Sequence, residues 1–193
     1  HLIERFPTMR FHATDVSAGM LAQSHVPPAQ RFVGHAYDHT FPVKRFDAVF
    51  MLGVTTYLSP EELDRNMAFI AHSLTPGGKA IITFTNRHGL DTQVRELLRT
   101  PMRWLGRRDK VLSSGLRTRN YSLKEVRAAL APHLRIDEVD VHNHTVFPFG
   151  LLVPGLVIPV AKRMARWKHS AFLRWLSSDL LIRASSQGDQ KIS

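Results

Sequence analysis

Apolar and polar positions along the chain predict strands and helices in turn. Residues 46–52 (FDAVFML) form a continuous apolar run, which is typical of a strand buried on both faces. Residues 79–85 (KAIITFT) are rich in β-branched side chains and indicate another strand. Shorter strands are predicted at residues 10–14, 31–35, 135–141 and 179–184.

The clearest helix signal follows Ser59. Ser59 is a good N-cap, Pro60 suits the first helical position, and Glu62 completes a capping box. We expect the Pro76-Gly77-Gly78 turn to end this helix. Its buried face is predicted from the helical spacing of Leu63, Met67, Ile70 and Leu74.

Further helices are predicted on either side of this one. Ser122 and Glu125 form a second capping box before an apolar face of Leu123, Val126 and Leu130. Residues 17–25 have a helical pattern that puts Met20 and Leu21 on the inner face. The remaining helical segments are the end of a helix at 1–7 and a basic amphipathic helix at 162–176.

Strands that alternate with helices predict an α/β fold with a doubly wound parallel sheet. Such sheets bind ligands at the carboxyl ends of their strands. With 193 residues the chain has room for one domain with a sizeable core.

Charge and composition narrow the chemistry. The chain has no cysteine, which excludes disulfides, thiolate catalysis and cysteine metal sites. Its formal charge of +10 indicates an anionic partner, which can be nucleic acid, a membrane surface or an acidic substrate. No signal peptide follows His1, so the chain is expected to be a fragment or a processed product. We expect it to be cytoplasmic, with membrane association as the alternative.

The stretch FHATDVSAGML places one acid, Asp15, between a strand and a helix. In a nucleotide-binding α/β sheet, an acid at the end of the second strand accepts hydrogen bonds from both ribose hydroxyls. A carboxylate suits this role because it has two acceptor oxygens and no donor. Val16 can then lie against the adenine. The alternative is that Asp15 or Ser17 only caps the helix.

Three motifs in order, TDVSAGML, FDAVFMLGVTTYLSPEEL and LTPGGKAIITFTN, resemble the class I S-adenosylmethionine-dependent methyltransferases. The resemblance runs from His1 to the closing strand near Ala184. It implies a Rossmann-like, doubly wound, mostly parallel sheet and S-adenosyl-L-methionine as cofactor. It also implies that Asp15 holds the ribose, while Val16 and Met20 flank the adenine.

The same resemblance implies further cofactor contacts. After the third strand of the family fold, GHAYDHTFP should supply an acid and a backbone amide to the adenine. His35 stands where the family usually has Asp, so we carry His35, Ala36 and Asp38 as candidates, with a solvated loop as the alternative. The end of the fourth strand should pass the methionine part of the cofactor at Met51, Leu52 and Gly53, with plain core strand as the alternative.

One family element is absent. None of the 11 glycines forms the Gly-rich turn that follows the first strand of the family, and HLIERFP resembles the end of the helix after that turn. The first strand and the glycine loop are therefore missing from this chain. We expect residues 1–193 to be a single methyltransferase domain that is truncated at its N-terminus, a fragment of a longer enzyme.

The acceptor is predicted from the end of the fourth strand. FMLGVTTY lacks the Asn-Pro-Pro type of motif that binds a base or amide nitrogen, and it resembles small-molecule O- or C-methyltransferases. Nucleic acid is therefore not an expected partner. Tyr57 stands where many such members have His, so we expect it to face the substrate, with a packed tyrosine as the alternative. No catalytic constellation is visible, and none is required for methyl transfer.

Two stretches, 86–121 and 146–176, are expected to be insertions on the substrate side. Arg95, Arg99 and Arg103 form a stripe in the first, either on a lid over an acidic or lipidic substrate or on an ordinary solvated face. The second is apolar and then basic, which predicts an apolar acceptor pocket, peripheral membrane contact or core packing. A small, apolar or lipid-like acceptor is the preferred hypothesis.

Two other functions stay open from the sequence. The charge favours an RNA methyltransferase or an RNA-binding module. The missing glycine loop favours a non-catalytic, methyltransferase-like interaction subunit. His142 and His144 alternate on a strand, but no third ligand is in view, so no metal site is expected.

Overall fold

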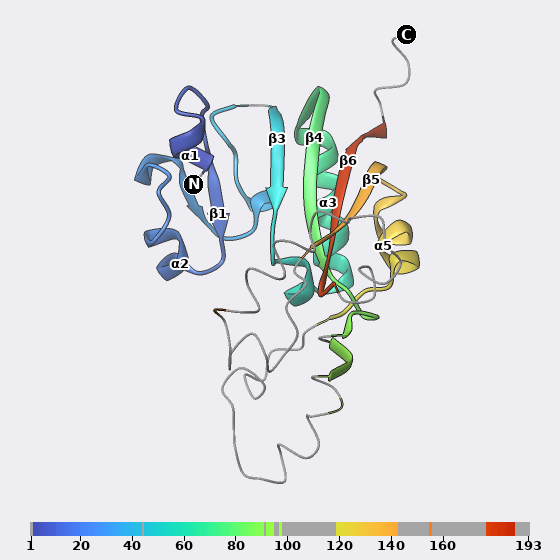
Figure 1. Ribbon diagram of the computed structural model, residues 1–193. Helices are drawn as coiled ribbons and strands as arrows, with labels where there is room; N and C mark the ends of the chain where they lie inside the picture. Colours follow the sequence, from blue (N-terminus) through green and yellow to red (C-terminus); the bar gives the residue numbers. More distant parts are fainter. Residues whose placement is uncertain are drawn as a thin grey trace. The chain divides into compact units, whose positions relative to one another are not determined.

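The computed structural model describes residues 2–43, 45–90, 92–94, 97, 119–142, 155 and 177–187. The chain divides into two compact units, His1–Arg45 and Phe46–Ser193. Figure 1 shows the elements of both units.

The first unit contains a two-stranded parallel sheet. β1 (Ala13–Asp15) pairs with β2 (Arg31–Val33) in a register that places Asp15 opposite Val33. β1 thus lies slightly later in the sequence than the predicted strand at 10–14. The other elements are α1 (Leu2–Arg5), α2 (Ala18–Ala22) and the 3₁₀ helices η1 (Pro28–Gln30) and η2 (Ala36–Asp38).

α2 is shorter than the helix predicted at 17–25, and Arg31 supplies the reason. The Arg31 guanidinium donates hydrogen bonds to the carbonyls of Ala22, Ser24 and Val26. Carbonyls at the end of a helix need such partners when no further turn follows. Arg31 thereby connects the end of α2 to the start of β2.

The second unit is built on a four-stranded sheet with the order β3-β4-β6-β5, which Figure 1 shows as neighbouring arrows. β6 runs antiparallel to both β4 and β5, whereas β3 is parallel to β4. β3, β4 and β5 therefore point the same way, and the predicted Rossmann-like α/β sheet is confirmed. The strands span β3 (Phe46–Met51), β4 (Leu74–Thr85), β5 (Leu134–His142) and β6 (Asp179–Ser186).

Both predicted capping boxes are formed. The Ser59 hydroxyl accepts from the Glu62 amide (3.1 Å) and the Glu62 carboxylate accepts from the Ser59 amide (2.7 Å), at the start of α3 (Pro60–Ser73). Ser122 and Glu125 form the same pair before α5 (Leu123–Leu130). Both helix starts were predicted correctly because the contacts of a capping box involve residues that are close in the sequence.

The prediction that the Pro76-Gly77-Gly78 turn ends α3 is wrong. The helix ends at Ser73, and Leu74 already pairs with Phe46 as the first residue of β4. The Pro76-Gly77-Gly78 turn lies inside β4, between the pairs Phe46–Leu74 and Ala48–Lys79, and makes the strand irregular there. Gly77 has a φ of 80°, which favours glycine.

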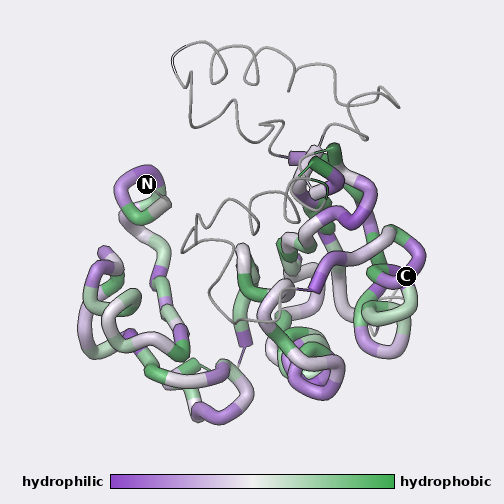
Figure 2. The backbone as a smooth tube through the Cα atoms, turned by 90° about the horizontal axis from the view of Figure 1, so that it is seen from below, coloured by the Kyte–Doolittle hydropathy of each residue, from purple (hydrophilic) through white to green (hydrophobic). Residues whose placement is uncertain are grey.

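The core of the second unit lies between the sheet and its helices. α3 packs against β4 and β6, α5 packs against β5, and the two helices contact each other. Figure 2 shows hydrophobic and hydrophilic residues interspersed along the described backbone, as expected for half-buried helices and strands. Side chains with no exposed surface include Met67, Ile82, Phe84, Val126 and Ile182.

The expectation that residues 46–52 are buried on both faces is wrong. β3 is an edge strand of the four-stranded sheet, and Phe50 is 44% exposed. Met51, the next residue, is buried in the core. Successive side chains of a strand point to opposite faces, and only one face of β3 meets the core. Met51 is therefore buried and Phe50 is exposed.

Several predictions fall wholly or partly outside the described residues. These include most of the stretches 86–121 and 146–176, the arginines at 95, 99 and 103, and His144. In the part of the chain that is described, no helix has both the length and the apolarity needed to cross a bilayer.

Candidate functional site

Asp15 lies at the carboxyl end of β1, and only part of its carboxylate is used locally. Oδ1 accepts a hydrogen bond from the Ser17 amide (2.8 Å), and the Asp15 carbonyl accepts from the Gly34 amide of the neighbouring strand (2.9 Å). Within the described ranges, Oδ2 accepts no hydrogen bond. One acceptor oxygen of Asp15 therefore orients the loop, and the other is available to a ligand.

Ser17 caps the helix, as the alternative interpretation of this stretch predicted. Its hydroxyl accepts from the Met20 amide (3.3 Å) and makes Ser17 the N-cap of α2. Asp15 lies outside the helix and supports this cap through the Ser17 amide. The helix thus has its own cap, and the second oxygen of Asp15 has no structural task in the described unit.

The side chains beside Asp15 are apolar and exposed. Val16 is 65% exposed and Met20 is 60% exposed, while Leu21 is buried. The expectation that Met20 faces inward is wrong, because Leu21 alone fills the inner side of the short α2. Two exposed apolar side chains next to a carboxylate form a surface that can contact a flat, polar-edged ligand.

The segment after β2 lies at the same end of the first sheet. Because β1 and β2 are parallel and Asp15 pairs with Val33, His35 follows only two residues beyond that pair. His35 stacks on Tyr37 with ring centroids 5.0 Å apart, and its carbonyl accepts from the Asp38 amide (3.1 Å). Ala36 begins η2, and the Asp38 side chain is exposed. The structure thus brings Asp15 and the His35–Asp38 segment to one edge.

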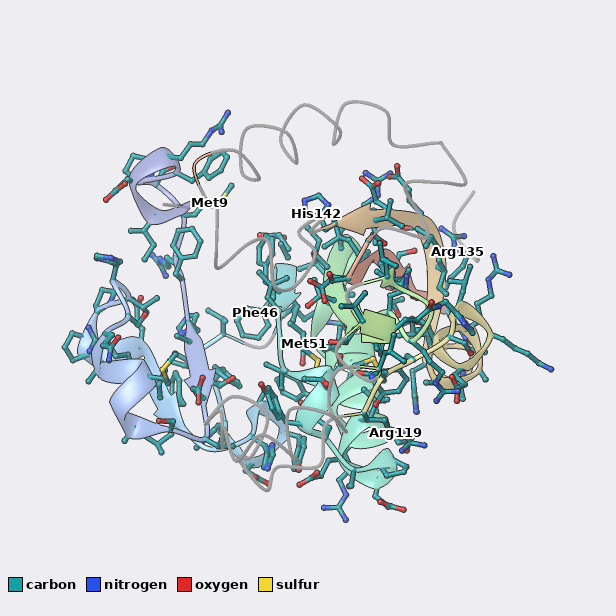
Figure 3. All side chains as sticks on the ribbon, turned by 60° about the horizontal axis from the view of Figure 1, so that its bottom comes forward. Met9, Phe46, Met51, Arg119, Arg135 and His142 are labelled. Carbon is teal, nitrogen blue, oxygen red and sulfur yellow. The ribbon has the colours of Figure 1, made fainter. Side chains whose placement is uncertain are left out.

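The second unit places its candidates where β3 ends. Met51, labelled in Figure 3, is the last residue of β3, and Leu52 beyond it is exposed. Gly53 has a φ of 69°, and its amide donates to Thr83 Oγ1 of β4 (2.8 Å). No other atom lies within 4 Å of the point where a Cβ would stand. The sequence suggested that another backbone approaches Gly53 closely. No protein segment does so, and open space lies there instead.

Tyr57 is not a packed tyrosine. It lies in the 3₁₀ helix η3 (Thr55–Tyr57) with its side chain 56% exposed. The packed tyrosine of this region is Tyr121, whose hydroxyl donates to the Thr55 carbonyl (3.2 Å). Burial raises the pKa of Tyr121, although the nearby Arg119 guanidinium opposes this.

Buried polar residues that the sequence interpretation missed support this loop. The Thr55 hydroxyl donates to the Thr83 carbonyl (2.7 Å), so β4 holds both Gly53 and Thr55. The buried Asn86 donates from Nδ2 to the Ser177 carbonyl (3.0 Å) and accepts at Oδ1 from the His88 amide (3.1 Å). The available signal was the polar residues Thr83, Thr85 and Asn86 at the end of the β-branched segment AIITFTN.

No metal cluster is evident in the described ranges. Within them, no group of at least three His, Asp or Glu side chains is close enough together to hold an ion. His142 contacts the Val141 carbonyl through Nδ1 (3.1 Å).

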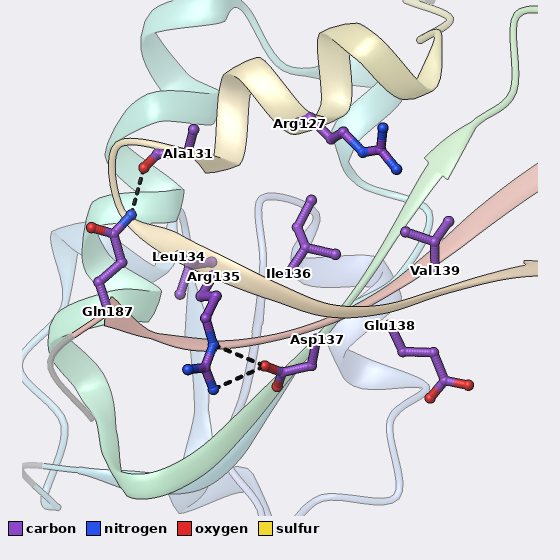
Figure 4. Close-up of a pocket in the computed structure, with 9 residues that line it drawn as sticks. All are labelled: Arg127, Ala131, Leu134, Arg135, Ile136, Asp137, Glu138, Val139 and Gln187. Atoms are coloured by element: carbon purple, nitrogen blue, oxygen red, sulfur yellow. Dashed lines mark hydrogen bonds and ion pairs between the residues drawn. The ribbon is translucent and has the colours of Figure 1, made fainter. Parts of the chain in front are cut away.

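A surface pocket of about 660 Å³ lies beside α5 and the first half of β5 (Figure 4). Because β5 points the same way as β3 and β4, this half of the strand is far from their carboxyl ends. Its Asp137 carboxylate already accepts from Lys79, Arg135 and Ser185. This pocket is therefore not the candidate site.

Comparison with known proteins agrees with the fold. Residues 1–82 match the family model described as "Methyltransferase domain". No curated protein sequence matches the chain.

Three solved structures are similar at low identity. The PH0226 protein from Pyrococcus horikoshii OT3 is 17% identical with a TM-score of 0.56, and the match covers 96% of this chain and 75% of that chain. An S-adenosylmethionine-dependent methyltransferase from Clostridium acetobutylicum ATCC 824 is 13% identical with a TM-score of 0.56, and the match covers 95% of this chain and 78% of that chain. CalO1, a methyltransferase in calicheamicin biosynthesis in its SAH-bound form, is 12% identical with a TM-score of 0.53, and the match covers 95% of this chain and 44% of that chain. At such identities the likeness concerns the fold.

The family match, the fold and the motif order agree. The first 82 residues thus match a methyltransferase domain, and the fold is similar to that of solved S-adenosylmethionine-dependent methyltransferases.

Proposed function

We propose that the chain binds S-adenosyl-L-methionine and transfers its methyl group to a small, apolar or lipid-like acceptor by O- or C-methylation. The observation that carries the proposal is the Asp15 carboxylate at the carboxyl end of β1. One of its oxygens has no partner in the described unit, and exposed Val16 and Met20 flank it. The family match supports the same reaction.

The residues present fit the adenosine part of this cofactor. A ribose offers two hydroxyl donors, and a carboxylate offers acceptor oxygens without a donor. Val16 and Met20 supply apolar contact for the adenine faces. His35, Ala36 and Asp38 lie at the same edge as Asp15 and are proposed to contact the adenine edge.

Met51, Leu52 and Gly53 are proposed to hold the methionine part. Gly53 has open space where any other residue would carry a Cβ, so a ligand can approach this backbone. Thr83 fixes the Gly53 amide, which keeps the backbone in that conformation.

When bound, the cofactor supplies an electrophilic methyl group on a sulfonium. The chain then has to hold the acceptor in line with that methyl group, and such positioning can contribute about 7–11 kcal/mol of a barrier. Tyr57 is exposed on the loop after β3 and is proposed to contact the acceptor. A cytoplasmic location, contact with a membrane surface and the absence of a nucleic-acid partner remain predictions from the sequence.

Calorimetric titration with S-adenosylhomocysteine tests the proposal. The variant Asp15→Asn keeps an oxygen for the Ser17 amide but loses the charge and one acceptor. Hydrogen bonds to charged groups are worth about 1.5–3 kcal/mol, so the affinity should fall at least about tenfold.

Glu61→Gln is the matched control. Glu61 is an exposed acid in the first turn of α3, and it lies outside the candidate residues. Its loss of one negative charge should leave the affinity unchanged. Equal affinities of Asp15→Asn and the unmodified chain would refute the assigned role of Asp15, and absence of binding to the folded chain would favour a non-catalytic interaction subunit.

A further inference from the structure

Arg119 is tied to the loop after β3, although 63 residues separate it from Thr56. The Arg119 amide donates to the Thr56 carbonyl (2.7 Å), and the Arg119 carbonyl accepts from the Thr56 hydroxyl (2.9 Å). This double contact fixes the backbone of Arg119 at the carboxyl end of the β3–β4 pair, where open α/β sheets bind ligands.

The Arg119 guanidinium, whose residue is labelled in Figure 3, lies over an aromatic ring that is itself fixed. Its Cζ is 5.7 Å from the centre of the Tyr121 ring. Tyr121 is held by its amide, which donates to the Thr85 carbonyl (2.8 Å), and by edge contact with Phe84 at 5.1 Å. A cation in this setting has less freedom than one on an ordinary surface arginine.

The charge of Arg119 faces an aromatic ring and has no carboxylate partner among the described residues. The residue is exposed. Arg87, two residues beyond the end of β4, differs in this respect, because it forms an ion pair with Glu125 (2.9 Å). Arg119 is therefore a positioned cation that lacks a described anionic partner.

Apolar side chains are exposed on the same loop. Leu52 is 53%, Val54 is 40% and Tyr57 is 56% exposed, and Thr56 of this segment carries the contact to Arg119. Exposed apolar side chains on the loop that holds the backbone of a cationic residue match a ligand with an apolar body and an acidic group.

We propose that Arg119 is a specificity-determining residue that receives the acidic group of an anionic, amphiphilic acceptor. The apolar part of that acceptor lies on Val54 and Tyr57. The inference rests on the proposed function and refines its acceptor class. A guanidinium binds carboxylate and phosphate in the same forked geometry, so the acidic group is one of these two.

The test compares three probes that share a ten-carbon chain and differ in their head group: decanoate, decyl phosphate and decanol. Each is titrated calorimetrically below its micelle concentration, with and without S-adenosylhomocysteine. We expect one anionic probe to bind about tenfold or more tightly than decanol, as charge-assisted hydrogen bonds imply. Which anion binds better separates a carboxylate acceptor from a phosphate one.

Variants separate recognition from a structural role. Arg119→Gln should abolish the preference for the anionic probe while leaving decanol binding unchanged, and Arg119→Lys should keep part of the preference. Arg127→Gln removes the same charge from an exposed position on α5 and should keep all of it. Thermal unfolding midpoints check that each variant is folded.

Other outcomes would overturn the inference. One is that the unmodified chain shows no preference for an anion. Others are that Arg119→Gln keeps the preference, or that it loses decanol binding and anion binding equally. The last is that Arg127→Gln loses the preference as much as Arg119→Gln does. Failure of S-adenosylhomocysteine to bind would count against the proposed function instead, because the titrations without it still report on Arg119.

Discussion

At the scale of single residues, the backbone at Gly53 determines how the loop after β3 leaves the sheet. Its φ of 69° is a left-handed conformation that ordinary side chains disfavour by about 1–2 kcal/mol. Space is not the constraint, because no atom lies within 4 Å of a Cβ placed there. Conformation alone therefore explains the need for glycine.

Two substitutions at Gly53 test this explanation. Gly53→Ala should lower the free energy of unfolding by about 1–2 kcal/mol. Gly53→Asn should cost less, although asparagine is larger, because its side chain tolerates the left-handed region. Urea unfolding of the two variants measures the difference, and a larger loss for Asn would show that space rather than conformation is limiting.

At the scale of elements, α5 depends on an acid at its start. Glu125 accepts from the Ser122 amide and hydroxyl, and it also pairs with Arg87. The hydrogen bonds from the Ser122 amide and hydroxyl lower the pKa of Glu125 from 4.5 to about 2, with a further contribution from Arg87, although desolvation opposes them. The capping box is therefore a pH-sensitive contact.

The direction of this pH dependence follows from the lowered pKa. A carboxyl group that is more acidic in the folded state stabilises the fold above its unfolded pKa, and this contribution disappears as the pH falls toward the folded value. The unmodified chain should thus exceed Glu125→Gln in unfolding free energy at pH 7, and the difference should shrink between pH 4.5 and pH 2. Urea unfolding across this range measures it, and a constant difference would contradict the assignment.

At the scale of the whole molecule, one acid joins three strands of the second unit. Asp137 of β5 accepts from Lys79 of β4 (2.8 Å) and from the buried Ser185 of β6 (2.9 Å), and it also contacts Arg135. Burial opposes its charge, but these donors outweigh burial and lower the pKa of Asp137. The neighbouring Glu138 pairs with Arg183 at the surface, where both partners are about half exposed.

The two adjacent acids should differ in their effect on stability. Asp137→Ala leaves the buried Ser185 hydroxyl without its acceptor, which should cost about 1–3 kcal/mol. Glu138→Ala removes only an exposed pair and should cost less than about 1 kcal/mol. Chemical unfolding of both variants measures the contrast, and equal losses would show that Asp137 does not join the strands energetically.

Part of the fold and of the site was predictable because its causes are local. Both capping boxes lie within four residues, so Ser59 and Ser122 were correctly placed at helix starts. Asp15 could be singled out because an acid directly after a short strand is visible in the sequence. Arg119 could not, because its partner Thr56 is 63 residues away.

The sequence by itself determined the order of strands and helices, the helix starts and the methyltransferase-like motifs, because capping, strand periodicity and motif order are contained in short segments. The tertiary structure decided which faces are covered. Phe50 is exposed although its strand is mostly apolar, since only one face of β3 meets the core. It also decided which distant polar groups meet, as for Thr83 with Gly53 and Asp137 with Lys79, because strand register and crossovers bring them together.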